Sequence, residues 1–382
     1  MPLEMRRMNW YNVQQYAFMR KTDHIGGTCM ELDEFDDLPL TEGTQKKKGR
    51  RGCLVALIVL LSLLLAGLLA IAMIGNYYLG RLNRFANPVP NASEPKMSDE
   101  FDTDTQHGIE TLETVDASDV TFSTVDVLEG DMINIMLIGQ DRRPGEDRSR
   151  SDSMILVTLN KQKNTIQLTS FMRDLYVQIP GYLDNRLNVA YRYGDVPLMN
   201  ETFRVNFGLE IDGNVMVDFD EFTEIIEVIG GVTLEMSSAE ANYMNKHSDN
   251  NFQAGVNYMN ADDALTFTRM RYAAGGDYGR TDRQRRVLTA LAESVRDTDV
   301  WTILELFDRI LPHLSTNLDN AQILQCIKDG ASILSKGGEI QTYRIPQDDA
   351  HYQASIRGMA VLVPDLEMCR EDLQEFIYSD AE

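Results

Sequence analysis

The residues best suited to chemistry in this chain of 382 residues are arginines gathered in one short stretch. They are Arg269, Arg271, Arg280 and Arg283, and they belong to a protein with a formal net charge of -23. A planar guanidinium stays charged and donates paired hydrogen bonds to phosphate or carboxylate. An acidic protein that concentrates arginine in this way is therefore expected to build an anion site, with a solvated basic helix as the alternative.

The sequence around Arg280 and Arg283 favours the anion site. Thr281 followed three residues later by Gln284 has the pattern of a capping box, which predicts that a helix begins at Thr281. The apolar residues that follow recur at helical spacing: Val287, Leu288, Leu291 and Val295. Arg280 and Arg283 would then lie at a helix N-terminus, where free N–H groups and the helix dipole favour anions.

Charged residues also occur at the ends of three predicted strands, which is where α/β folds place ligand chemistry. Asp141 follows the first of these strands. Arg150 and Asp152 immediately precede the second, and Arg173 follows the third. Carboxylates and arginines without a histidine cluster suit Mg²⁺ (or Mn²⁺) and phosphate, because Mg²⁺ prefers hard oxygen ligands and arginine offsets phosphate charge.

The elements that must position these residues form one predicted α/β domain over residues 132–382. Strands and helices alternate without internal repeats, which favours a central mixed β-sheet flanked by helices. The predicted strands are Ile133–Ile138, Met154–Leu159, Thr165–Phe171, Val215–Phe219, Val232–Met236 and Glu339–Ile345. The predicted helices are Val196–Phe207, Asp220–Ile229, Ala261–Arg269, Thr281–Arg296, Trp301–Leu311, Asn320–Leu334 and Asp365–Tyr378.

Three segments of different composition precede this domain. Residues 1–52 lack an apolar period and predict a largely disordered tail. Residues 53–75 contain the uninterrupted apolar run Leu54–Ile74, which is on the order of the 20 residues that span a bilayer. Residues 76–131 are rich in proline and acidic residues, and they predict a flexible stalk.

The apolar run predicts one retained transmembrane helix. A cleaved secretory signal is the alternative, but the segment before the run is far longer than the n-region of a signal peptide. Lysines and arginines between Lys46 and Arg51 keep that side in the cytoplasm by the positive-inside rule. We therefore expect a single-pass protein of the cell membrane, with a cytoplasmic N-terminus and an extracytoplasmic domain.

Composition also argues against some partners, and it leaves open whether two of the cysteines form a disulfide. The strongly acidic charge argues against nucleic acid, which needs a large basic face. The scattered histidines do not indicate a metal site or a serine–histidine–aspartate triad. Cys326 and Cys369 fall on the side of the predicted membrane span where a disulfide can persist, and two buried thiols are the equal alternative.

The ordered set of motifs resembles the LytR-CpsA-Psr family. The segments that carry the resemblance are Asn134–Asp141, Arg150–Val157, Arg173–Val177, Ile179–Gly181, Leu187–Tyr191, Gly230–Val232, Arg269–Arg271 and Gly279–Gln284. The family consists of membrane-anchored phosphotransferases outside the cytoplasm of Gram-positive bacteria. They move glycopolymers such as teichoic acid or capsule from a polyprenyl-pyrophosphate carrier to peptidoglycan.

This resemblance implies roles for individual residues. Asp141 and Asp152 would be the Mg²⁺-associated acidic residues. The residues implied for the pyrophosphate are Arg150, Arg173, Arg269, Arg271, Arg280, Arg283 and, beside them, Gln284. Two other functions stay open: hydrolysis of the lipid pyrophosphate by the same site, and a membrane-bound regulator that senses the lipid carrier.

Overall fold

The chain forms two compact units, Met1–Leu63 and Leu64–Glu382, and all the described residues belong to the second. The computed structural model describes residues 77, 80–85, 111–123, 125–140, 151–270, 275–296, 306 and 309–379. The predicted tail and transmembrane helix lie outside these residues, as does most of the predicted helix Trp301–Leu311. Within the described part of the chain, no helix combines the length and apolar character needed to cross a membrane.

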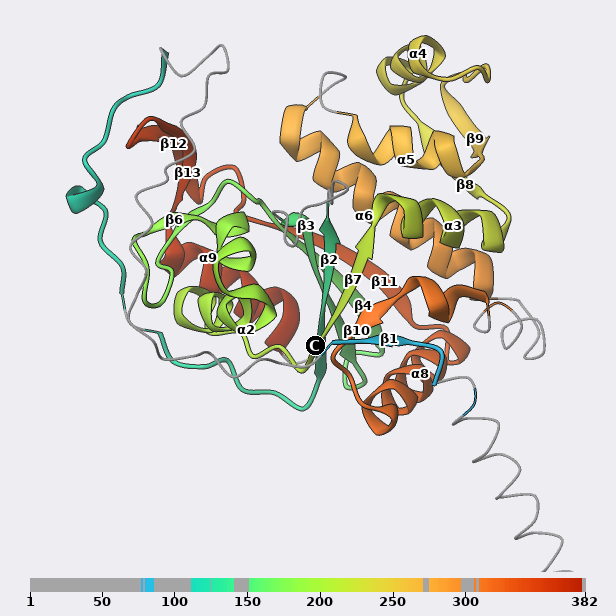
Figure 1. Cartoon of the computed structure of the whole chain (residues 1–382), viewed down its shortest axis with the longest axis horizontal. Helices are drawn as coiled ribbons and strands as arrows, with labels where there is room; N and C mark the ends of the chain where they lie inside the picture. The colour runs from blue at the N-terminus through green and yellow to red at the C-terminus, as the bar shows by residue number, and fades with distance from the viewer. Residues whose placement is uncertain are drawn as a thin grey trace, which may run out of the picture. The chain divides into compact units, whose positions relative to one another are not determined.

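A seven-stranded mixed sheet forms the centre of the second unit (Figure 1). Its strand order is β1-β10-β7-β2-β3-β4-β11. The bounds in that order are Asn83–Arg84, Ser315–Thr316, Gly213–Asp218, Ile133–Gln140, Ser151–Asn160, Thr165–Phe171 and Glu339–Ile345. Strand β2 pairs parallel with β7 and antiparallel with β3, and β4 pairs antiparallel with β3 and parallel with β11. The prediction of an α/β domain with a mixed sheet is confirmed.

The register of these strands brings several strand ends to one edge of the sheet. Gln140 at the end of β2 pairs with Ser151 at the start of β3 and with Asp218 at the end of β7. Phe171 at the end of β4 pairs with Ile345 at the end of β11. Residues that immediately follow β2, β4 and β7, or that open β3, therefore converge at this edge.

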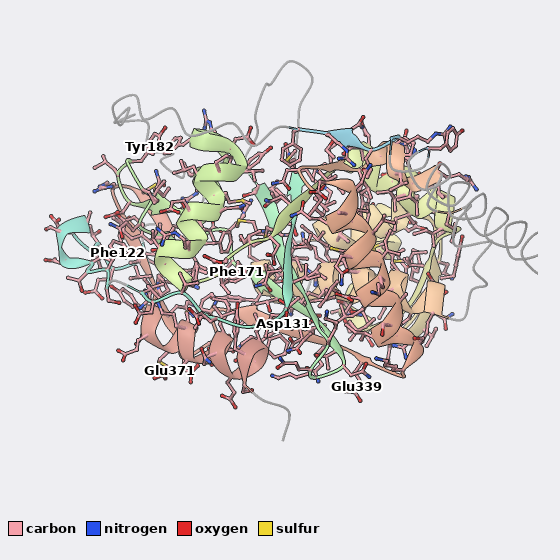
Figure 2. The ribbon with its side chains drawn as sticks, turned by 90° about the horizontal axis from the view of Figure 1, so that it is seen from below. Phe122, Asp131, Phe171, Tyr182, Glu339 and Glu371 are labelled. Atoms are coloured by element: carbon pink, nitrogen blue, oxygen red, sulfur yellow. The ribbon has the colours of Figure 1, made fainter. Side chains whose placement is uncertain are left out.

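Helices α2 (Leu187–Phe207) and α9 (Leu366–Leu373) cover one face of the sheet (Figure 1). Phe171 lies between the sheet and α2 (Figure 2), where its ring centroid is 4.8 Å from that of Phe203 and 5.2 Å from that of Phe207. Non-helical backbone at Gly194 and Asp195 interrupts α2. The sequence pattern therefore predicted only the second half of this helix, from Val196 onward.

The opposite face of the sheet is covered by α8 (Asn320–Ser335) and α6 (Gly276–Arg296). Side chains alternate along β2, so that Met136 belongs to the core under α2 while Ile135 contacts the core that contains Ile323 of α8. The predicted bounds Ala261–Arg269 and Glu339–Ile345 match α5 and β11. The register and the alternation confirm the buried strands that the sequence predicted.

A subassembly of short elements packs against α6. It comprises α3 (Phe219–Ile229), β8 (Val232–Met236), α4 (Ser238–His247), β9 (Gly255–Met259) and α5 (Ala261–Arg269), which share one hydrophobic core. Strand β8 pairs with β9 rather than with the central sheet. The sequence pattern did not predict α4 or β9, nor the hairpin of β12 (His351–Ile356) and β13 (Met359–Pro364).

The predicted start of α6 is wrong. The helix begins at Gly276, and the two residues Gly275 and Gly276 have φ values of 91° and 57°, which glycine adopts without strain. Thr281 therefore lies inside the helix, where its hydroxyl donates to the carbonyl oxygen of Tyr278 at 2.9 Å. The capping-box pattern is present in the sequence but does not cap this helix.

The prediction of a flexible stalk also fails for the part of residues 76–131 that the structure describes. Strand β1 belongs to the central sheet. Further along, the Val115 N–H donates to the Ser355 carbonyl oxygen at 3.1 Å, and the Leu128 N–H donates to the Gly208 carbonyl oxygen at 2.8 Å. These residues are held against the domain by backbone hydrogen bonds that composition does not reveal.

Candidate functional site

The site lies where the ends of β3 and β4 meet, and its central contact is an ion pair. The Arg173 Nη1 lies 2.6 Å from Asp152 Oδ1. Asp152 is the second residue of β3 and Arg173 follows β4, so the antiparallel pairing of the two strands brings the residues together. The side chain of Asp152 is 25% exposed, which leaves the carboxylate accessible from solvent.

Arg173 contacts two further carboxylates. Its Nε lies 3.4 Å from Asp174 Oδ2, and its Nη2 lies 3.8 Å from Asp277 Oδ2. Burial alone would lower the pKa of Arg173, but Asp174, Asp152 and Asp277 together outweigh it and raise that pKa. The guanidinium of Arg173 therefore stays positively charged, with these three carboxylates around it.

Two more arginines join this cluster through the same carboxylates. Arg280 Nη1 lies 3.1 Å from Asp277 Oδ1, one turn into α6. Arg186 Nε lies 3.9 Å from Asp174 Oδ1. Burial raises the pKa of Asp174, although Arg173 and Arg186 oppose that shift. The set Asp152, Arg173, Asp174, Arg186, Asp277 and Arg280 is called the arginine–carboxylate cluster below.

Gln284 and Arg269 lie at the same edge of the sheet as the cluster, on two different helices. The Ser153 hydroxyl donates to Gln284 Oε1 at 3.0 Å, which ties α6 to β3 beside Asp152. Arg269, at the end of α5, places its Cζ 4.3 Å from the centroid of the Phe219 ring. Phe219 follows Asp218, the partner of Gln140, so Arg269 lies at the sheet edge where β2 ends.

Arg283 turns toward a different set of residues. It is buried, its Nη2 donates to the Met270 carbonyl oxygen at 2.5 Å, and its Nη1 lies 3.6 Å from Glu240 Oε1. Glu240 also accepts from Arg286 Nη1 at 2.8 Å. These contacts join α6 to α4 and to the end of α5, so they stabilise the subassembly, and a part for Arg283 in pyrophosphate binding stays a prediction.

Three of the predicted site residues, Asp141, Arg150 and Arg271, lie outside the described residues. Among the residues that are described, no three histidine, cysteine, aspartate or glutamate side chains gather closely enough to hold a metal ion. Asp152 has the chemistry that Mg²⁺ requires, a hard carboxylate oxygen that solvent reaches. Its pairing with Asp141 as a metal site stays a prediction.

The sequence pattern did not predict Asp174 and Asp277 as part of the site, and the structure adds Arg186 to them. Asp174 is the sequence neighbour of Arg173, whereas Asp277 and Arg186 meet Arg173 and Asp174 across many residues, so no local pattern indicates those contacts. One signal was available: Asp277 lies in the first turn of α6, where a carboxylate is favoured by the helix dipole. Cys326 and Cys369 are both free thiols, which settles the open question about a disulfide.

The fold and the site together define an α/β protein with paired arginines and carboxylates at one edge of a mixed sheet. The LytR_cpsA_psr family model matches residues 98–374, and the chain belongs to this family. The match covers the arginine–carboxylate cluster and every strand of the central sheet except β1. The resemblance that the sequence motifs predicted is thereby confirmed.

Similar proteins include polyisoprenyl-teichoic acid–peptidoglycan teichoic acid transferases named TagU. The protein of Bacillus cereus is 31% identical over 227 residues, which cover 59% of this chain and 72% of that protein. The protein of Oceanobacillus iheyensis is 34% identical over 199 residues, which cover 50% of this chain and 60% of that protein.

Solved structures share the fold. TagT bound to LI-WTA is 22% identical with a TM-score of 0.54, and the match covers 68% of this chain and 100% of that one. B. subtilis TagV is 26% identical with a TM-score of 0.52, and the match covers 66% of this chain and 100% of that one. YwtF (TagT) with bound octaprenyl pyrophosphate lipid is 20% identical with a TM-score of 0.51, and the match covers 68% of this chain and 100% of that one.

Proposed function

We propose that this chain transfers a glycopolymer, such as teichoic acid or capsule, from a polyprenyl-pyrophosphate carrier to peptidoglycan. The observation that carries the proposal is the arginine–carboxylate cluster at the sheet edge, in a chain whose relatives are named teichoic acid transferases. Arginines fixed in this way are suited to a pyrophosphate, because paired N–H donors match its oxygens. The YwtF structure with bound octaprenyl pyrophosphate lipid supports a donor of the same kind.

In this mechanism the protein binds and orients the donor. Arg173 and Arg280 offset the charge of the pyrophosphate, and the remaining predicted arginines complete its binding. A hydroxyl group of peptidoglycan attacks the phosphorus nearer the glycan and gives its proton to an aspartate of the site. The bond from that phosphorus to the bridging oxygen breaks, and polyprenyl phosphate leaves. Mg²⁺ (or Mn²⁺) held by Asp141 and Asp152 would supply further offset of phosphate charge.

The proposal includes a location. A retained membrane helix over residues 53–75 would keep the N-terminus in the cytoplasm and the catalytic domain outside it. The donor lipid is confined to the same membrane, so the tether raises the effective concentration of enzyme and substrate. The apolar run Leu54–Ile74 and the basic residues before it support this topology.

The test is a transfer assay with the purified full-length chain, a polyprenyl-pyrophosphate-linked glycopolymer and peptidoglycan. The expected products are polyprenyl phosphate and glycopolymer covalently bound to peptidoglycan. Polyprenyl phosphate formed at the same rate without peptidoglycan would instead identify a hydrolase. If no product forms in either reaction while the lipid still binds, a regulator that senses the lipid carrier is the better description.

A further inference from the structure

A cavity of about 300 Å³ opens beside the arginine–carboxylate cluster. Its lining is formed by Leu112, Met172, Asp174, Gly275, Gly276, Asp277, Tyr278, Gln353, Ala360, Val361 and Leu362. The lining comes from the start of α6, from the segment after β4 and from the hairpin of β12 and β13. The proposed function as stated assigns no ligand to this cavity.

Two carboxylates decide which ligands the cavity accepts. Asp174 and Asp277 both line it, and a phosphate placed against them would be repelled by their negative charge. A hydrocarbon chain there would remove water from both carboxylates, whose side chains are 20% and 30% exposed, and the loss of hydration of a charged group is costly. The ligand that fits must therefore offer several donors, as the hydroxyl groups of a sugar do.

The rest of the lining is partly apolar. Met172, Val361 and Leu362 face the same cavity as the carboxylates. Tyr278 and Gln353 add further polar groups. A sugar ring matches this mixture, because its C–H face is apolar and its edge carries hydroxyl groups. The cavity volume is at the lower end of the range for small-molecule sites, so it suits a short unit and not a polyprenyl tail.

The cavity also lies next to the atoms that would react. Asp174 and Asp277 line it, and these same carboxylates lie 3.4 Å and 3.8 Å from nitrogen atoms of Arg173. A sugar held in the cavity would therefore lie beside a phosphate on Arg173, because both would lie next to the same two carboxylates. An acceptor hydroxyl needs this kind of placement, because attack requires it to lie close to the phosphorus.

We propose that this cavity is the subsite for a sugar unit of the acceptor glycan, whose hydroxyl groups donate hydrogen bonds to Asp174 and Asp277. The proposal rests on the proposed transferase function and names the place where that reaction takes its second substrate. Burial of Asp174 favours such donors, because a carboxylate that has lost hydration gains more from a new hydrogen bond.

The experiment narrows the cavity without touching the cluster. Ala360→Phe adds a large side chain at a partly buried lining position, and Ala360→Val adds a smaller one. The matched control is Ala331→Phe, which adds the same ring at an exposed position of α8. The full-length variants are compared in detergent by calorimetric binding of soluble peptidoglycan glycan fragments and, separately, of octaprenyl pyrophosphate, with thermal unfolding as the check on folding.

We expect Ala360→Phe to weaken binding of the glycan fragments by about tenfold or more, or about 1.4 kcal/mol, with a smaller loss for Ala360→Val. Octaprenyl pyrophosphate should bind all variants as it binds the unchanged chain. Equal glycan binding by both folded Ala360 variants and the unchanged chain would overturn the subsite, as would a parallel loss of octaprenyl pyrophosphate binding. If the glycan results are as expected but no variant transfers glycopolymer, the transferase function fails and the sugar subsite stands.

Discussion

At the scale of single residues, the chemistry of the site depends on Arg173. It contacts Asp152, Asp174 and Asp277, which come from the start of β3, the segment after β4 and the start of α6. Its side chain is 18% exposed, so solvent and a ligand both reach it. Arg173 therefore contacts three carboxylates before any substrate is bound, and two of them also pair with Arg186 and Arg280.

Replacing this arginine should abolish most of the transfer reaction. We expect Arg173→Ala to lower the transfer rate by on the order of 10²-fold or more, because a preorganised donor to the phosphoryl oxygens is lost. Arg173→Lys should restore only part of the rate, because an ammonium cannot donate the paired hydrogen bonds of a guanidinium. The measurement is the rate of glycopolymer transfer at saturating donor.

The control for this series is Arg204→Ala. Arg204 pairs with Glu201 on the surface of α2, with both side chains more than 40% exposed, so its loss should leave transfer unchanged. Full activity in Arg173→Ala would remove this residue from the proposed mechanism.

At the scale of elements, Glu240 connects α4 to α6. Its carboxylate accepts from Arg286, and from the Ser237 N–H at 2.9 Å in a capping box. Burial alone would raise the pKa of Glu240, but the hydrogen bonds from Arg286 and Ser237 outweigh it and hold this pKa below its ordinary value of 4.5. The carboxylate therefore stabilises the fold in its charged form.

Because the pKa of Glu240 is lowered, the loss of unfolding free energy caused by Glu240→Gln should depend on pH. A carboxylate with a lowered pKa contributes its stability above pH 4.5 and loses it as the pH falls through the folded-state pKa. We expect the variant to lose about 2–3 kcal/mol of unfolding free energy at pH 7, because buried Arg283 and half-buried Arg286 lose their charged partner. Urea unfolding should show this difference shrinking below pH 4.5.

Glu293→Gln is the matched control on α6. Glu293 pairs with Arg296 at 2.9 Å on the surface, so its loss should cost no more than about 0.5 kcal/mol at either pH. A difference for Glu240→Gln that stays constant from pH 7 to pH 4 would contradict the assigned pKa shift.

The end of α2 gives a second prediction at this scale. Gly208 ends the helix with a φ of 70°, and a Cβ added there would lie 2.5 Å from the Asp126 carbonyl oxygen. Gly208→Ala should therefore lower the unfolding free energy by about 1–3 kcal/mol. Gly330→Ala in α8 meets no atom within 4 Å and should raise it by about 0.5–1 kcal/mol.

Thermal or urea unfolding measures the stability of both glycine variants. Each variant is the control for the other, because their unfolding free energies should change in opposite directions. If Gly208→Ala proved as stable as the unchanged chain, residues 126–128 would not hold the end of α2 as the structure indicates.

At the scale of the whole molecule, the proposed membrane tether predicts how the reaction depends on location. A variant that lacks residues 1–76 should leave the membrane fraction and still bind octaprenyl pyrophosphate in detergent. Its transfer rate with donor embedded in vesicles should fall by about 10²-fold or more, because the effective concentration from the tether is lost. Cell fractionation and the vesicle assay measure the two effects.

The control variant lacks only residues 1–45 and keeps the basic run and the apolar segment. It should remain in the membrane fraction with its transfer rate nearly unchanged, as expected of a transferase and not of a sensor that signals through its tail. Persistence of the shorter chain, without residues 1–76, in the membrane fraction would contradict the proposed anchor.

The sequence by itself determined the family, most of the elements and part of the site. Strand and helix periodicity is local information, so the buried strand Thr165–Phe171 and the helix Ala261–Arg269 could be predicted with the bounds that the structure has. The ends of those strands also indicated Asp152 and Arg173, because the residues that flank strands converge at a sheet edge.

Only the tertiary structure decided which charges meet. Asp277 reaches Arg173 across more than one hundred residues of chain, and this contact exists because α6 packs against the edge where β3 and β4 meet. Arg283 lies within one turn of Arg280 in sequence, yet it turns to Glu240 and Met270 because of the position of α4 and α5. Spacing along a helix predicts neighbours on that helix, whereas these partners depend on how separate elements pack.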